Sequence, residues 1–186
     1  MRTRLSWMAL LLLPGTLACG GGGGGGGVVP GGGGSMTATF VPATSSPGPK
    51  SSVMGLGNVA GELVTVTVNL TDVSNVYGAA FSVTYDPARV SFHGSSAGTI
   101  LETGGHTPTY QVTAAQAGTV VVGATRNGNV AGVNVSGTKT LVRLTFQVNV
   151  EGDTPLQFSA PELYDGAVPP QPIAGVTWSA GVLSAQ

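Results

Sequence analysis

Residues 77–85 of the chain read Tyr-Gly-Ala-Ala-Phe-Ser-Val-Thr-Tyr, with large apolar side chains at every second position towards the end. Phe81 and Val83 alternate there with the small polar residues Ser82 and Thr84. Residues 63–71 and 140–150 repeat the pattern with valines, leucines and threonines. A two-residue period of this composition is typical of antiparallel strands that are buried on one face only. We therefore expect these three segments to be half-buried strands.

Shorter segments of the same character fill the rest of the chain. They are residues 37–41, 89–93, 107–114, 119–125, 156–159 and 175–183. Turn-forming pairs such as Asp86-Pro87 and Asn127-Gly128 separate them, and no segment has a sustained helical period. About nine short strands at regular spacing predict an all-β protein, an antiparallel β-sandwich of jelly-roll type.

The composition limits the possible functions. The chain has 186 residues, 31 glycines and only 8% charged residues, with a formal net charge of -1. This charge offers no basic surface for a nucleic acid, and a single cysteine cannot form an internal disulfide. Twelve of the glycines lie between residues 20 and 34. Because such a stretch buries nothing, we expect residues 19–35 to be a flexible tether and residues 36–186 to be the folded domain.

The first 18 residues have the features of an export signal. Arg2 and Arg4 precede the apolar residues 5–13, a run shorter than the roughly 18 residues that span a membrane. The segment that ends in Ala18-Cys19 resembles a bacterial lipobox. The resemblance implies that Cys19 is lipidated and that the lipid is the only membrane contact. Since Gly20 follows, it also implies an exported lipoprotein of the outer membrane or cell surface. An ordinary signal peptide is the alternative.

Catalytic and metal-binding patterns are weak. Residues 94–98 match the G-x-S-x-G pattern of hydrolases, but that pattern requires a turn from strand to helix. His93 and His106 are the only histidines, too few for a zinc site of several such ligands. The acidic residues stand at separate turns or together in one turn, where solvation is the simpler role. We expect no enzyme activity, no cofactor and no metal.

Three stretches in order resemble the cohesin family. Residues 72–87, ending in Tyr85-Asp86-Pro87, are similar to its early strands. Residues 123–126 and 137–146 resemble a later pair of strands, and Leu163-Tyr164-Asp165-Gly166 resembles the start of the closing hairpin. The resemblance implies a nine-stranded jelly roll. It also implies a monomeric module that holds a dockerin, a small calcium-loaded helical module on another protein.

The family's contact face can be carried over to this chain by position. The resemblance implies that the partner-binding residues are Ala80, Ser82, Thr84, Val121, Thr125, Arg126 and Asn127. In cellulose-degrading assemblies the family's face carries acidic and amide residues. In this chain the first strand of the face offers only small and hydroxyl side chains.

Two other functions are compatible with the sequence. A polysaccharide-binding module would present exposed aromatic rings, and the candidates for this role are Tyr110 and Tyr164. Trp178 is in phase with Val176 and Ala180, so we expect it in the core, as we do Phe81 and Phe146. The third possibility is a structural module of the cell envelope with no separate ligand.

Overall fold

A computed structural model describes residues 36–186, which form eleven strands and one short 3-10 helix, η1 (Ile100–Glu102). The strands are β1 (Ala38–Pro42), β2 (Ser51–Ala60), β3 (Leu63–Thr71), β4 (Val76–Thr84), β5 (Val90–Ala97), β6 (Thr109–Gln116), β7 (Thr119–Thr125), β8 (Thr138–Val148), β9 (Gly152–Asp165), β10 (Thr177–Ser179) and β11 (Gly181–Ala185). The expected signal peptide (residues 1–18), the tether (residues 19–35) and the lipidated Cys19 lie outside the described residues. Across residues 36–186 there is no helix with the length and apolar character of a membrane span.

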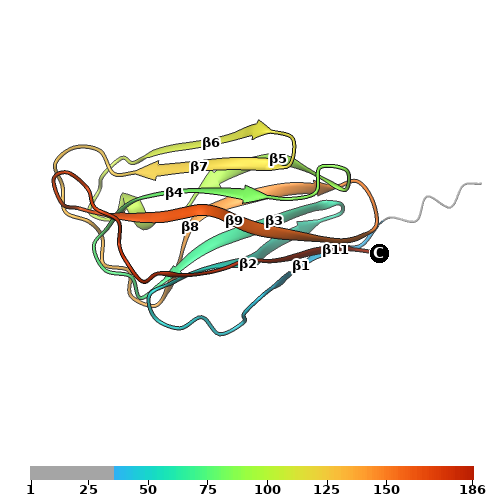
Figure 1. Cartoon of the computed structure of the whole chain (residues 1–186), viewed down its shortest axis with the longest axis horizontal. Coiled ribbons are helices and arrows are strands. Elements are labelled where there is room, and N and C mark those ends of the chain that lie inside the picture. The colour runs from blue at the N-terminus through green and yellow to red at the C-terminus, as the bar shows by residue number, and fades with distance from the viewer. Residues whose placement is uncertain (1–35) are drawn as a thin grey trace, which may run out of the picture. The chain divides into compact units, whose positions relative to one another are not determined.

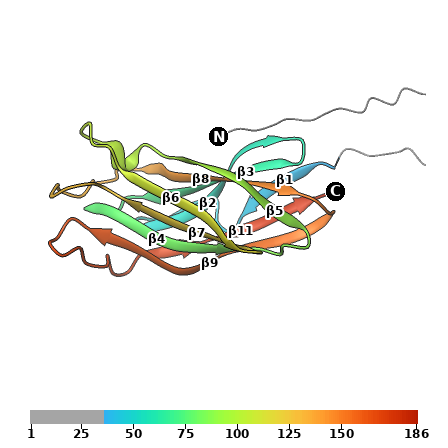
Figure 2. The same ribbon diagram turned by 90° about the horizontal axis from the view of Figure 1, so that it is seen from above.

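The strands form two sheets that face each other (Figures 1 and 2). One sheet has six strands in the order β1-β11-β9-β4-β7-β6, and the other has five in the order β10-β2-β3-β8-β5. Every pairing is antiparallel except that of β10 with β2, which is parallel. The all-β sandwich predicted from the alternating segments is therefore confirmed.

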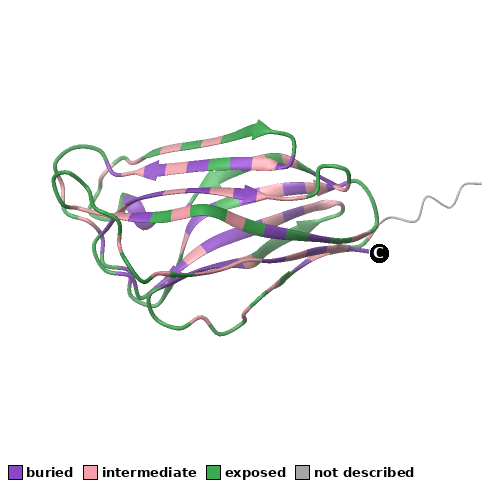
Figure 3. Ribbon diagram, viewed as in Figure 1, coloured by how far each residue is buried: buried purple, intermediate pink, exposed green. Residues whose placement is uncertain are grey.

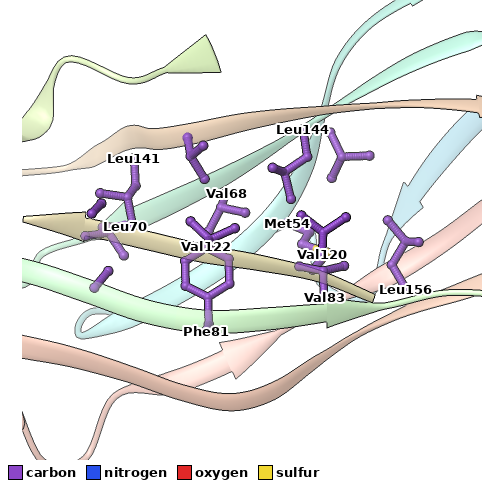
Figure 4. Close-up of a cluster of buried hydrophobic side chains, with 14 of the residues drawn as sticks. Met54, Val68, Leu70, Phe81, Val83, Val120, Val122, Leu141, Leu144 and Leu156 are labelled. Atoms are coloured by element: carbon purple, nitrogen blue, oxygen red, sulfur yellow. The ribbon is translucent and has the colours of Figure 1, made fainter. Parts of the chain in front are cut away.

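The core lies between the sheets because each strand turns its apolar side chains inward. Phe81 and Val83 of β4 and Val122 of β7 face Val68 and Leu144 of the other sheet (Figure 4). The alternation of buried and exposed positions is visible along β4 and β7 (Figure 3).

Aromatic side chains extend this core. The rings of Phe81 and Phe158 lie 5.5 Å apart, and Trp178 lies 4.9 Å from Phe158, in an edge-to-face arrangement. Phe146 is fully buried and its ring lies 5.4 Å from that of Tyr85. Such pairs stabilise a core beyond the area that they bury. The expected core positions of Phe81 and Phe146 are confirmed, and Trp178 packs against the core while it stays partly exposed.

The strand count of eleven exceeds the expected nine for two reasons. Strand β2 lacks alternation, because its first four residues are buried whereas Leu56 and the residues after it are exposed. The segment 175–183 contains two strands, because the chain crosses between sheets at Ala180. Before this residue β10 pairs with β2, and after it β11 pairs with β9.

The two ends of the domain meet at one end of the sandwich. The backbone groups of Thr37 and Gln186 exchange hydrogen bonds of 2.8 and 3.1 Å, and Ala38 pairs with Ala185. The loops that contain residues 126–137 and 166–176 lie at the opposite end (Figure 1). The start of β4 and the ends of β7 and β9 therefore lie far from the termini.

Candidate functional site

Four neighbouring strands of the six-stranded sheet, β9, β4, β7 and β6, present an ordered outer surface, here called the four-strand face. The strand register fixes which side chains are neighbours across it. The rows are Tyr164–Gly78–Thr125–Thr109, Glu162–Ala80–Gly123–Gln111, Ser159–Ser82–Val121–Thr113 and Gln157–Thr84–Thr119–Gln116. These rows point away from the core because the alternate residues of the same strands are the buried ones.

Five of the residues predicted for partner binding lie together on this face. Ala80, Ser82 and Thr84 follow one another along β4, and Val121 and Thr125 lie beside them on β7. Val121 is 42% exposed and adds apolar area to this surface. The structure thus brings these residues to one surface, and their contact with a partner stays a prediction.

Arg126 is not part of the face, which corrects the sequence-based expectation. Its side chain is only 4% exposed, and its Nη1 and Nη2 atoms donate to the carbonyls of Leu101 and Thr103 at 3.2 and 3.0 Å. The physical reason is the alternation of inward-facing and outward-facing side chains along β7. The Arg126 amide continues the ladder of β7 by donating to Tyr77, so position 126 keeps the inward direction of Ala124. The two hydrogen bonds from Arg126 therefore hold the η1 segment against the end of β7.

Asn127 lies at the rim of the face and is exposed. Its side-chain amide donates to the Thr107 carbonyl at 2.8 Å, and its side-chain oxygen accepts from the Thr109 hydroxyl at 3.0 Å. These two bonds fix the start of β6 against the end of β7. Any contact that Asn127 makes with a partner would share its side chain with this structural role.

The polar groups of the two outer surfaces differ in their availability. On the five-stranded sheet, hydroxyls bond to one another across strands. Thr65 and Thr145 are 3.1 Å apart, Thr71 and Thr138 are 2.8 Å apart, and Thr140 donates to Asn69 at 2.8 Å. These threonine hydroxyls are therefore already bonded within the sheet.

On the four-strand face, by contrast, Ser82 and Thr84 make no side-chain hydrogen bond to another residue of the described range 36–186. Both are partly exposed. The strands β4, β6 and β7 contain no charged residue, and Glu162 of β9 is the only charged residue in the four rows. The face therefore offers free hydroxyls, small side chains and almost no charge. A partner would lose little hydration free energy by covering it.

A hollow crosses one end of this face, where two glycines take the place of side chains. Gly78 of β4 and Gly123 of β7 form its floor, and its volume is about 320 Å³. Tyr164 and Pro170 line one side, and Thr109 and Gln111 of β6 line the other. We call this hollow the glycine groove. Each strand that lines the groove could be predicted from its own sequence segment. The groove itself could not, because it depends on which strands are neighbours in the sheet.

The two tyrosines considered for carbohydrate binding do not form a common platform. Tyr164 lies on the outer face in the row of Gly78, whereas Tyr110 turns inward from β6, packs on the core and donates to the Gly98 carbonyl at 3.1 Å. Burial, with a smaller contribution from the charge of Glu102, raises the pKa of Tyr110 to about 12. The Tyr164 hydroxyl donates to the Glu162 carboxylate, and this bond raises the pKa of Tyr164 above its ordinary value.

The remaining chemical patterns have simple structural positions. Residues 94–98 lie mostly in β5, an edge strand that pairs with β8, and not at a turn from strand to helix. Within residues 36–186 no three side chains of His, Cys, Asp or Glu gather at a possible metal site.

An open sheet face with this topology defines a class of protein. The chain belongs to the cohesin family, because residues 49–170 match the family model described as the cohesin domain. No curated protein sequence is significantly similar to the chain.

Solved structures agree in fold. A type II cohesin domain from the cellulosome of Acetivibrio cellulolyticus superposes with a TM-score of 0.55 at 18% identity, covering 72% of this chain and 95% of that one. A non-cellulosomal cohesin from the archaeon Archaeoglobus fulgidus gives 0.50 at 19% identity, covering 69% and 87%. The third cohesin of ScaC from A. cellulolyticus, solved in complex with the ScaB dockerin, gives 0.54 at 19% identity, covering 66% and 88%.

Proposed function

We propose that this protein is a non-catalytic binding module that holds a dockerin-type partner on its four-strand face. The observation that carries the proposal is the contrast between the two outer surfaces. The hydroxyls of four threonines on the five-stranded sheet bond to one another across strands, whereas within residues 36–186 no side-chain hydrogen bond engages Ser82 or Thr84 on the four-strand face. Membership of the cohesin family supports the class of partner, since a related cohesin was solved in complex with a dockerin.

The chemistry of the face suits a helical partner. Ala80 and Gly123 lie opposite each other, so the backbone of a partner helix can approach the sheet closely there. Val121 supplies exposed apolar area beside them. Hydrogen bonds from Ser82 and Thr84 would fix the orientation of the helix, and the scarcity of charge would select a partner whose contact surface is also neutral.

We infer further that the module is displayed from a membrane through Cys19. The support is the sequence alone: an export signal, a lone cysteine where a lipobox would end, and a glycine-rich segment before the domain. A lipid anchor and a flexible tether would confine the monomeric module near the outer membrane or cell surface. They would thereby raise the local concentration of any captured partner.

The test of docking is a binding measurement with purified dockerin modules of both type I and type II. Each is titrated into the protein by calorimetry, once with calcium and once with a chelator. We expect at least one dockerin to bind only in the presence of calcium. Replacing Ser82→Arg should weaken that binding by at least about tenfold, because a long charged side chain would stand in the middle of the face without a counter-charge.

Ser95→Arg is the matched control, because Ser95 is exposed on β5 of the other sheet. It should leave the affinity unchanged. The proposal fails if no dockerin binds, or if both arginine variants weaken binding equally. Sedimentation with insoluble polysaccharides runs in parallel, and retention of the protein there without any dockerin binding would favour the carbohydrate-binding alternative.

A further inference from the structure

The glycine groove depends on two glycines for different reasons. A Cβ atom on Gly78 would lie 2.9 Å from the carbonyl oxygen of Ala124, so the close approach of β4 and β7 requires glycine there. A Cβ atom on Gly123 would meet nothing within 4 Å, and its φ is not in the left-handed region. The fold therefore accepts a side chain at position 123. A side chain there would occupy the groove, which glycine leaves open.

The polar groups that line the groove are largely engaged within the protein. The hydroxyls of Thr109 and Thr125 donate to acceptors at the rim of the sheet, at 3.0 and 3.1 Å. The phenol of Tyr77 donates to a loop carbonyl at 2.7 Å, and that of Tyr164 donates to a carboxylate. These donors would have to break an existing bond before they could serve a polar occupant.

The absence of charge among the residues that line the groove also favours an apolar occupant. None of the ten residues that line the groove is charged at neutral pH. The nearest charge is that of Glu162 in the row of Gly123, whose carboxylate already accepts from Tyr164, so burying an ionised occupant in the groove is unfavourable. An apolar occupant would instead gain from contact with the tyrosine rings, the proline and the glycine floor. The volume of about 320 Å³ is at the lower end of the range for small-molecule sites, which suits one large side chain and not an extended ligand.

We propose that the glycine groove is an anchor pocket that receives one uncharged apolar side chain, aromatic or branched aliphatic, from the partner's helix. This inference rests on the proposed docking function for the source of that side chain. The chemistry of the pocket itself does not depend on it. A buried aromatic or aliphatic anchor of this kind commonly supplies much of the affinity of a protein interface.

The first test needs no partner. The amide resonances of the ¹⁵N-labelled protein are followed by NMR while N-acetyl-tryptophanamide or N-acetyl-leucinamide is added. N-acetylglycinamide, which has no side chain, is the control ligand. We expect saturable shifts at Gly78, Gly123 and Thr125 with at least one of the two apolar ligands, with a dissociation constant on the order of 1 mM. The control ligand should produce none.

The second test uses a matched pair of variants. Gly123→Leu fills the groove, whereas Gly94→Leu makes the same change on β5, where an added Cβ also meets nothing within 4 Å. Gly123→Leu should abolish the shifts, and it should weaken any dockerin found to bind by at least about tenfold. Gly94→Leu should change neither.

The outcomes separate the two proposals. If no dockerin binds but the apolar ligands bind and Gly123→Leu abolishes their binding, the docking function fails and the pocket stands. If a dockerin binds and Gly123→Leu leaves its affinity unchanged, the anchor pocket is wrong and the docking function stands. Shifts that are absent, or that persist in Gly123→Leu, overturn the pocket in either case.

Discussion

Gly123 of β7 lies directly across from Ala80 of β4, so the middle of the four-strand face has no side chain larger than a methyl group in this row. The next row contains Ser82 and the exposed Val121. The glycine groove therefore begins at this row, and the exposed Val121 stands beside it in the next. This shape favours close contact with a rigid element such as a helix.

Val120 and Val121 provide the first prediction, because they are neighbours in sequence with opposite environments. Val120 is fully buried, whereas Val121 is 42% exposed on the four-strand face. Val120→Ala should lower the free energy of unfolding by about 2 kcal/mol through lost burial and a small cavity. Val121→Ala should change it by no more than roughly 0.5 kcal/mol. Urea unfolding followed by tryptophan fluorescence measures both, and equal losses would contradict the assigned face.

The hydrogen bonds from Arg126 to the η1 segment give the second prediction. Arg126→Met keeps an unbranched side chain as far as the ε position but removes the donors to Leu101 and Thr103. Hydrogen bonds from charged groups contribute about 1.5–3 kcal/mol each, so the turn after η1 should open more often. The amide protons of Thr103 and Gly105 should exchange with solvent at least about tenfold faster in hydrogen-exchange NMR.

Two comparisons limit the interpretation of that experiment. The amide of Val122 should keep its protection in Arg126→Met, because its strand pairs with β4 and β6 independently of the turn. Asn127→Ala, a change at the exposed neighbour, should leave Thr103 and Gly105 protected. Loss of protection across the whole sheet would mean that Arg126 supports the fold as a whole and not this turn.

Tyr110 gives a prediction about alkaline pH. Its pKa is raised to about 12 in the folded protein, whereas an unfolded tyrosine ionises near pH 10. Below pH 10 both states hold the proton and the group has no effect on the pH dependence. Between pH 10 and about 12 the unfolded state releases its proton first, so stability falls as pH rises.

Tyr110→Phe should remove this part of the alkaline loss. The comparison is the urea midpoint at pH 8 and at pH 11 for both proteins, since the other tyrosines are common to them. We expect a smaller decrease for Tyr110→Phe than for the wild-type protein. Equal decreases would show that the Tyr110 phenol titrates alike in the folded and unfolded states.

The lipid anchor inferred from the sequence is tested through Cys19. Bacterial cells that express the protein are grown with radiolabelled palmitate, and the protein is then partitioned into detergent. The wild-type chain should carry label and enter the detergent phase, and Cys19→Ser should do neither. An unlabelled wild-type protein of the mature size would instead establish an ordinary cleaved signal peptide.

Much of the fold could be predicted because strand alternation is a local property. Residues 63–71 and 119–125 coincide with β3 and β7. Strand order was not readable, since β4 and β9 are neighbours through packing of the whole sandwich although many residues separate them. The same limit explains why the residues that β6 and β9 add to the four-strand face were not predicted.

The error at Arg126 has a different origin, because the necessary signal was present. Val120, Val122 and Ala124 mark the inward phase of β7, and Arg126 continues it. Arg126 was expected at the turn beyond β7 as part of the partner-binding face, but its amide still bonds to Tyr77 and its side chain keeps the inward direction. Extending the alternation of β7 by one more residue predicts correctly that the side chain of Arg126 faces inward.

The pairing of β1 with β11 has a mechanical consequence. The described chain enters beside its own carboxyl end, while the glycine groove lies at the far end of the sandwich. If a partner held at the groove were pulled away from an anchored amino terminus, the force would run nearly along β1 and slide it past β11. In this shear geometry the hydrogen bonds of the pair share the load at once and do not open one after another. The fold would then resist tension in the direction in which a tethered module is pulled.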